Sequence, residues 1–116
     1  MIFPIKTMLG NLKMLKTYDY YDYPRFFSCE NDIGRKYVGL SVEDGEGVYV
    51  WLYVHISNSR LKDMEAGKIE LYDIFKKTED NFVFEVKTFD VGADKVSKLV
   101  CDDISDYLLP HKGTTL

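Results

Sequence analysis

One stretch decides the fold that we expect for this chain: Val48-Tyr49-Val50-Trp51-Leu52-Tyr53-Val54-His55-Ile56. Successive side chains of a β-strand point to opposite faces of a sheet, so the alternation of aliphatic and aromatic residues predicts a strand with two different faces. Such a strand is either covered on both faces within its own fold or presents its aromatic side chains to a partner. The aliphatic face would hold Val48, Val50, Leu52, Val54 and Ile56, and the aromatic face Tyr49, Trp51, Tyr53 and His55.

Three further strands are predicted upstream, over residues 12–20, 25–30 and 36–43, because apolar side chains recur there at every second position. In the first of them, alternation would place Leu12, Met14, Lys16 and Tyr18 on one face. Residues 12–56 are therefore predicted to form a four-stranded antiparallel meander. Its connections would be the turns Asp22-Tyr23-Pro24, Asn31-Asp32-Ile33-Gly34 and Asp44-Gly45-Glu46-Gly47.

The residues after this meander predict one or two short helices. Ser57 or Asn58 offers an N-cap, and Leu61 and Met64 follow at helical spacing before Gly67 ends the run. Over residues 69–75, apolar side chains recur at intervals of three and four, which favours a second short helix or turn over a strand.

Alternation returns in the last third of the chain. Residues 81–89 predict one further strand, and residues 96–101 are a candidate last strand with Val96 and Val100 pointing inward. The pattern as a whole predicts an α+β fold. It would be a bent antiparallel β-meander of five or six strands, with one or two short helices inserted after the fourth strand.

The length of 116 residues suits a single domain over residues 1–116. From about residue 102 we expect an extended tail, which Tyr107, Leu108 and Leu109 would pin to the body of the protein. Hydrophobic residues make up 46% of the chain and no apolar run approaches the roughly 20 residues of a membrane helix. We therefore expect a soluble, cytoplasmic protein with no membrane partner.

The net charge of −4 narrows the classes of partner. A general nucleic-acid binder needs a surplus of Lys and Arg on one face, so nucleic acid is not an expected partner. The acidic excess lies entirely after Lys77, where eight acidic and four basic residues follow. This region is either an ordinary solvated surface or a docking surface for a basic protein.

The cysteines and histidines are few and widely spaced. Cys29 and Cys101 form no Cys-x-x-Cys pair, and neither joins His55 or His111 in a cluster with ligand spacing. The sequence therefore predicts no metal site and no cofactor, and both cysteines are interpreted as small buried side chains.

Five short motifs follow one another along the chain: Tyr21-Asp22-Tyr23-Pro24-Arg25-Phe26-Phe27, Lys36-Tyr37-Val38, Trp51-Leu52-Tyr53-Val54, Ser57-Asn58-Ser59-Arg60-Leu61 and Gly67-Lys68-Ile69-Glu70-Leu71. In this order they resemble a family of uncharacterised bacterial domains, with an Asp-x-Pro-Arg-x-Phe strand start, a Trp-Leu-Tyr strand and a Ser-x-x-Arg-Leu helix start. The resemblance implies a fold and a bacterial or phage source. Because that family has no assigned activity, it implies no catalytic residues.

One histidine has the sequence context of a catalytic group. Val54-His55-Ile56-Ser57 matches the hydrophobic-His-hydrophobic-Ser element of two-histidine phosphoesterases, in which each histidine acts as a general acid or base. That chemistry needs two such elements facing each other, and His111 lacks the pattern. A histidine that simply ends a strand is the alternative, and we expect no enzyme activity.

Two arginines, Arg25 and Arg60, border apolar strand ends. A guanidinium in such a place can bind a carboxylate or stack on an aromatic ring. Internal ion pairs with Asp22 or Glu30 are the alternative to a role in binding. Trp, Tyr and Arg are the residue types most enriched at interface hot spots. The candidate partner- or ligand-binding residues are therefore Arg25, Tyr49, Trp51, Tyr53, His55, Ser57 and Arg60.

Two functional hypotheses follow. The first is a non-catalytic protein-interaction module, an accessory, inhibitory or antitoxin-like small protein of bacterial or phage origin. Its partner would be another protein, a basic one or a second copy of the chain. The alternative is a small-ligand or nucleotide-binding domain with a phosphoesterase-like site around His55, which requires His55, Ser57 and Arg60 to converge in a concave pocket.

Overall fold

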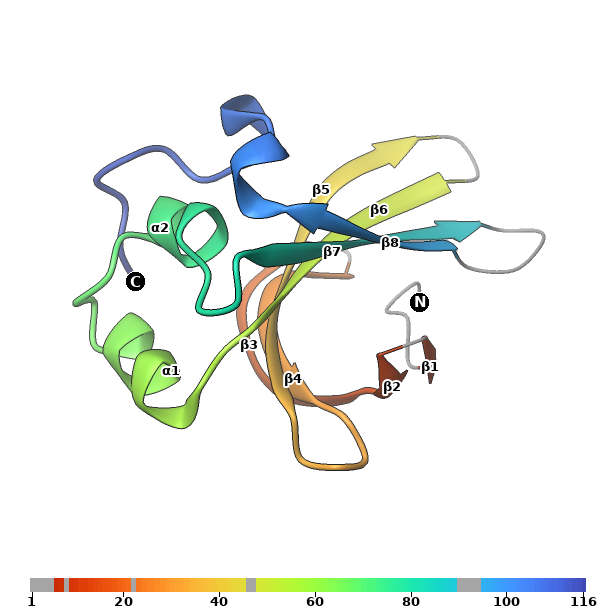
Figure 1. Cartoon of the computed structure of the whole chain (residues 1–116), viewed down its shortest axis with the longest axis horizontal. Helices are drawn as coiled ribbons and strands as arrows, with labels where there is room; N and C mark the ends of the chain where they lie inside the picture. Colours follow the sequence, from red (N-terminus) through yellow and green to blue (C-terminus); the bar gives the residue numbers. More distant parts are fainter. Residues whose placement is uncertain (1–5, 8, 22, 46–47, 90–94) are drawn as a thin grey trace.

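Six antiparallel strands form one bent sheet in the order β3-β4-β5-β6-β7-β8 (Figure 1). The structure is a computed structural model and describes residues 6–7, 9–21, 23–45, 48–89 and 95–116. Strands that follow one another in the sequence are neighbours in the sheet, so the topology is a simple meander. The strands are β3 (Lys13–Tyr21), β4 (Tyr23–Glu30), β5 (Lys36–Gly45), β6 (Val48–His55), β7 (Phe82–Phe89) and β8 (Lys95–Val100).

Two short helices, α1 (Asn58–Glu65) and α2 (Leu71–Lys76), connect β6 to β7. The hydroxyl of Ser57 caps α1 by accepting a hydrogen bond from the backbone N–H of Arg60 at 3.3 Å. Gly67 follows α1 with φ 74°, a left-handed conformation that glycine adopts without strain. The predicted α+β meander, with two helices after its fourth strand, is therefore confirmed. Within the described ranges, neither helix has the length and apolar character of a membrane-spanning segment.

One face of the sheet is covered by the two helices and by residues near the C-terminus. Leu52 and Val54 of β6 point to this face, as the alternation predicts. We call the cluster the helix-side core. Its buried members are Phe26, Val38, Leu52, Val54, Ile56, Leu61, Met64, Leu71, Ile74, Phe75, Val83, Cys101, Ile104 and Leu109.

The opposite face carries the aromatic side chains of β6. The ring of Phe27 packs edge-on against Trp51 and Tyr53, with centroid distances of 5.8 Å and 5.9 Å. A Cβ on Gly39 would lie 2.5 Å from the Phe27 ring, so this position on β5 requires glycine. We call this cluster the aromatic core, and its buried members are Leu9, Leu12, Phe27, Cys29, Tyr37, Trp51, Tyr53 and Val86.

A small N-terminal hairpin covers the aromatic core. Strands β1 (Lys6–Thr7) and β2 (Gly10–Asn11) pair with each other on the inner side of the bent sheet (Figure 1). The hairpin brings Leu9 and the following Leu12 into the aromatic core. The side-chain amide of Asn31, in the β4–β5 turn, donates a 2.8 Å hydrogen bond to the carbonyl of Leu9. No helix or strand is predicted from the sequence for the residues of this hairpin.

Irregular pairing of β3 overturns one prediction about its faces. The β3–β4 ladder has register shifts between Met14 and Lys16, between Thr17 and Asp19, and between Asp19 and Tyr20. A shift of one residue exchanges the two faces of a strand. Met14 therefore packs against the aromatic core, whereas Tyr18 packs against the helix-side core. The prediction that one face carries both was wrong.

The turn from Asn31 to Gly34 forms as predicted, with a 3.0 Å hydrogen bond from the N–H of Gly34 to the carbonyl of Asn31. The turn predicted from Asp44 to Gly47 includes residues 46 and 47, which lie outside the described residues. Val96 packs against the aromatic core as expected. Val100, predicted to point inward, is 44% exposed because it ends the last strand of the sheet.

The residues after β8 fold back over α2. Two short 3₁₀ helices, η1 (Cys101–Asp103) and η2 (Asp106–Leu108), lead to a final segment whose Thr114 carbonyl accepts a 2.8 Å hydrogen bond from the N–H of Leu71. Ile104 and Leu109 anchor this segment in the helix-side core. Tyr107 does not contribute to the anchoring as predicted, because its side chain is 86% exposed.

Candidate functional site

The aromatic residues proposed from the sequence as a binding surface lie mostly inside the protein. Trp51 and Tyr53 are fully buried in the aromatic core, and Tyr49 is partly buried against it. Of the two alternatives that the alternating strand left open, the structure therefore shows coverage within the fold. A partner that meets the surface of this chain cannot contact Trp51 or Tyr53 directly.

His55 ends β6 at the rim of the aromatic face. It is partly buried, and its ring lies 6.0 Å from the ring of Tyr37, its cross-strand partner on β5, in an edge-on arrangement. Arg25 is partly buried on β4. These two residues keep some exposure, but they belong to different strands and line no pocket that the structure describes.

Ser57 and Arg60 hold the two helices together. The N–H of Ser57 donates to the Glu79 carboxylate at 2.8 Å, while its hydroxyl caps α1. The guanidinium of Arg60 donates to the carbonyls of Asp73 and Lys77, at 3.1 Å and 2.7 Å, at the C-terminal end of α2. The carbonyl of Asp73 also accepts the N–H of Lys77 at 2.9 Å, so Arg60 adds a second donor there, and a cation at this end of a helix is favoured by the helix dipole. The Ser-x-x-Arg spacing therefore has a structural role: Ser57 caps α1, and Arg60, three residues later, binds α2.

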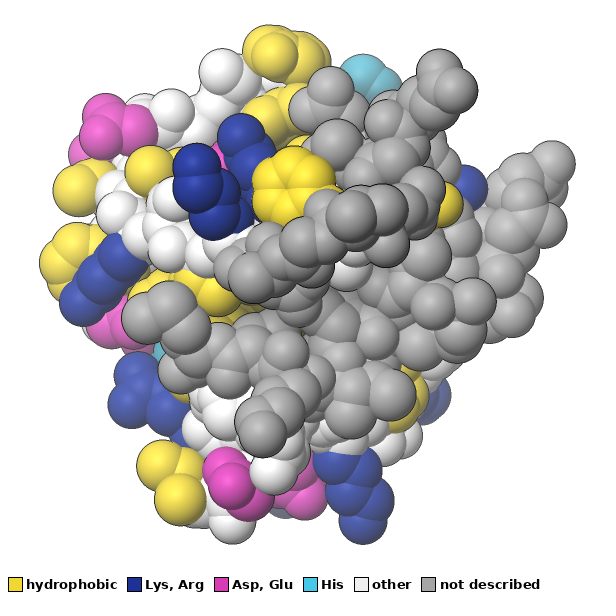
Figure 2. Space-filling model, turned by 90° about the vertical axis from the view of Figure 1, so that its right-hand side faces the viewer, with side chains coloured by type: hydrophobic (Ala, Val, Ile, Leu, Met, Phe, Trp, Pro, Cys, Tyr) yellow, Lys and Arg dark blue, Asp and Glu magenta, His cyan; other side chains and the backbone are white. Residues whose placement is uncertain are grey.

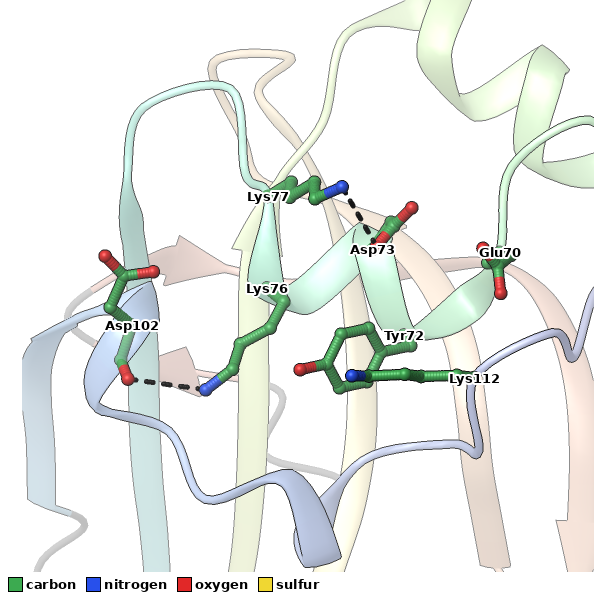
Figure 3. Close-up of a pocket in the computed structure, with 7 residues that line it drawn as sticks. All are labelled: Glu70, Tyr72, Asp73, Lys76, Lys77, Asp102 and Lys112. Carbon is green, nitrogen blue, oxygen red and sulfur yellow. Dashed lines mark hydrogen bonds and ion pairs between the residues drawn. The ribbon is translucent and has the colours of Figure 1, made fainter.

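A pocket of about 440 Å³ lies between α2 and the C-terminal segment (Figure 3). None of the seven candidate residues contributes to it. Sequence analysis missed it because the pocket depends on the C-terminal segment folding back over α2, and the only signal was the apolar pair before Pro110. The lining residues are Glu70, Tyr72, Asp73, Lys76, Lys77, Asp102 and Lys112.

The charged groups of this pocket largely satisfy one another. Lys76 donates to the carbonyls of Asp102, at 3.3 Å, and Ile104, and its ammonium lies 3.2 Å from the Asp106 carboxylate. The hydroxyl of Tyr72 donates to the same carboxylate at 2.8 Å. This hydrogen bond raises the pKa of Tyr72 and lowers the pKa of Asp106. The arrangement braces the C-terminal segment against α2.

Other contacts at the pocket have the same character. The ammonium of Lys77 lies 3.8 Å from the Asp73 carboxylate, and that of Lys112 lies 5.1 Å from the Tyr72 ring centroid. The three lysines are thus matched by neighbouring carboxylates and a ring. Among the residues that the structure describes, no three His, Cys, Asp or Glu side chains gather as metal ligands would.

Charged side chains of the described residues are mixed rather than segregated on one face of the molecule. On the face shown in Figure 2, the described Lys and Arg side chains lie in separate groups, with acidic and hydrophobic side chains among them. Recognition of nucleic-acid phosphates uses a continuous basic surface. The described part of this face offers no such surface.

The outer edge of β8 is a regular edge of the sheet. This strand pairs with β7 on one side, and no described strand pairs with it on the other. Its register with β7 is uninterrupted. The N–H of Cys101 donates to the carbonyl of Asn81 at 3.0 Å, and hydrogen-bonded pairs alternate along an antiparallel ladder. The backbone groups of Val96, Lys98 and Val100 therefore face the open edge.

The other edge of the sheet, β3, differs in its regularity. It is longer than β8, but its three register shifts interrupt the even spacing of backbone donors and acceptors that an added strand would need. The side chain of Tyr18 also ties β3 to α1, with its hydroxyl 2.7 Å from the Glu65 carboxylate. The sheet thus has one irregular edge and one regular edge.

These features define a class: a small α+β domain built on one antiparallel meander that is covered on both faces, with no described strand beside the outer edge of β8. The chain belongs to a family of unknown function (DUF6575), whose model matches residues 1–116. The resemblance to a family of uncharacterised domains is thereby confirmed. No curated protein and no solved structure matches the chain.

Proposed function

We propose that the chain is a non-catalytic protein-interaction module, an accessory, inhibitory or antitoxin-like small protein of bacterial or phage origin that acts in the cytoplasm. Its contact surface is the edge of β8, and binding occurs by addition of a partner's strand to the sheet.

The regular edge of β8 carries this proposal. Val96, Lys98 and Val100 direct backbone donors and acceptors outward at the constant spacing of an uninterrupted ladder. Long regular edges are an aggregation hazard that proteins commonly blunt with bulges, as on β3. The edge of β8 carries two lysines but no bulge, so its backbone keeps the regular spacing that a partner's strand needs.

The alternative, a phosphate-binding site around His55, has weaker support. Its polar groups would have to converge, but Arg60 is engaged with carbonyls of α2 and the Ser57 hydroxyl caps α1. The pocket beside α2 offers a concave volume, yet its lysines are occupied by internal partners. A site that must break such contacts to bind its ligand gains little from them.

Proline substitution at the edge tests the proposal. In Lys98→Pro, the ring removes an N–H that faces away from β7, so the β7–β8 ladder keeps its hydrogen bonds. The matched control Lys98→Ala removes the same side chain and keeps the N–H. Both variants are checked for an unchanged fold by thermal melting, and the wild-type chain is used to capture partners from a lysate of the native host.

The proposal expects a protein that co-purifies in stoichiometric amount with the wild-type chain and is recovered in far larger amount with Lys98→Ala than with Lys98→Pro. Dependence on one backbone N–H is what strand addition requires and what a side-chain interface does not. Equal recovery with both variants, or a nucleotide bound with no protein partner, would overturn it.

A further inference from the structure

We infer that the β8 edge selects an extended acidic segment of its partner, with two acidic side chains three positions apart. This rests on the proposed function, since it names the chemistry of the strand that β8 receives. The segment adds to the sheet antiparallel to β8, so its side chains lie directly beside those of β8.

The charges along the edge are all of one sign. The strand Lys95-Val96-Ser97-Lys98-Leu99-Val100 contains two lysines and no acidic residue, and both lysines are exposed. Their positions differ by three, so alternation directs them to opposite faces of the sheet. An incoming strand must therefore place one acidic side chain on each face to match both, which an interval of three provides.

The environment of Lys95 shows why an acidic neighbour is favoured there. Lys95 lies directly across from Lys87 in the β7–β8 register, and like charges in that position destabilise a sheet. The ammonium of Lys87 lies 3.8 Å from the carboxylate of Glu85. A carboxylate on an added strand would lie beside Lys95 and offset this repulsion.

Lys98 occupies the other face. Its ammonium lies 4.0 Å from the centroid of the Phe82 ring, which holds the charge above the end of β7. The side chain of Lys98 is exposed, so a carboxylate on a strand added at the edge can reach the ammonium from the side that the ring does not cover.

The same charges argue against a second copy of the chain as the occupant. Pairing β8 with β8 would bring four lysines together with no acidic residue in either strand. Lysines on an edge strand are a known device against self-pairing. The two lysines of β8 disfavour pairing with a second copy of the chain and favour pairing with an acidic strand. The same two charges therefore both exclude the wrong partner and bind the right one.

Three synthetic hexapeptides of equal length test this inference on the whole chain. In the first, two glutamates stand three positions apart in a background of valine and threonine. The second has the same composition with the glutamates two positions apart, which puts both on one face. The third carries lysines in place of the glutamates of the first. Binding is measured by hydrogen-exchange protection of the amides of Val96, Lys98 and Val100.

The inference expects the first peptide to protect these three amides most strongly, with an affinity that falls as salt is raised. In the double variant Lys95→Glu and Lys98→Glu, the lysine peptide should replace the first peptide as the better ligand. Loss of two exposed ion pairs corresponds to a change in affinity of roughly 2- to 30-fold.

Equal protection by all three peptides would overturn the charge inference and leave strand addition at β8 standing. Protection by none of them would also overturn it, and Lys98→Pro with the captured partner then decides the proposed function separately. Protection of the three amides that rises with the concentration of the chain alone would assign the edge to a second copy, against the inference.

Discussion

The two cores on either side of the sheet are assembled in different ways. The helix-side core is closed by α1 and α2, which follow β6 directly in the sequence, and by the C-terminal segment. The aromatic core is closed in part by Leu9 and Leu12, which precede the first strand of the sheet. One core rests on two helices, whereas the other depends on a small hairpin and on close contacts between rings. The comparison predicts that the aromatic core tolerates substitution less well.

Trp51→Ala should give the largest effect. The side chain is fully buried against Phe27, and its removal leaves a large cavity that neighbouring rings cannot fill. We expect the free energy of unfolding to fall by roughly 3 to 5 kcal/mol in chemical denaturation. Leu15→Ala, at a position 40% exposed on β3, is the control and should change it little. A Trp51→Ala protein as stable as wild type would show that this core is not close-packed.

Gly39→Ala tests the same ring contacts by adding a methyl group to the aromatic core instead of removing a side chain from it. The added methyl group would lie 2.5 Å from the ring of Phe27, which is fully buried, and 3.0 Å from the ring of Tyr53. We expect a loss of about 2 to 3 kcal/mol from overpacking. Phe27→Leu provides the partner for a double-mutant cycle, because the smaller side chain leaves room for the methyl group. Additive losses in the two variants would contradict direct contact as the cause.

Asn31→Asp tests how much the hydrogen bond between Asn31 and the N-terminal hairpin contributes to the stability of the aromatic core. The aspartate keeps the acceptor that binds the N–H of Arg35 at 2.8 Å, but it loses the donor to the carbonyl of Leu9. We expect a loss of about 1 kcal/mol. Hydrogen exchange of the Leu12 amide should speed up more than that of Val54, which lies in the helix-side core. Equal changes at the two amides would show that the hairpin does not open on its own.

A comparison of β3 with β6 shows how much of this fold can be predicted from the sequence. Both neighbouring strands pair with β6, and its described side chains follow the predicted alternation, with Leu52 and Val54 in the helix-side core and Trp51 and Tyr53 in the aromatic core. In β3 the same rule failed, because register shifts exchange the faces and nothing in the local pattern marks them. Alternation gives the faces of a regular strand, but a bulge depends on the strand beside it.

The candidate site was harder to predict, for a related reason. The aromatic side chains of β6 suit an interface and a core equally well, and the hairpin that buries them lies about forty residues away in the sequence. The edge character of β8 likewise follows from the order of all six strands rather than from residues 95–100. Ser57 could be read from the sequence as a helix N-cap, and the structure uses it in this way, whereas the contacts of Arg60 with the carbonyls of Asp73 and Lys77 depend on how α2 packs beside α1.

Ionisation of Cys29 should have the smallest effect on stability. The effect is absent at neutral pH and grows as the pH rises. Burial in the aromatic core raises the pKa of this thiol to about 12, from an ordinary value of 9.0. The unfolded chain therefore loses the proton first, so the contribution of Cys29 to stability is complete below pH 9 and is lost as the pH rises toward 12. Unfolding by denaturant at a series of pH values should show a steeper decline above pH 9 for the wild-type chain than for Cys29→Ala. Equal slopes would mean that the thiol ionises as readily in the folded protein as in the unfolded one, and that the hairpin leaves the aromatic core open to water.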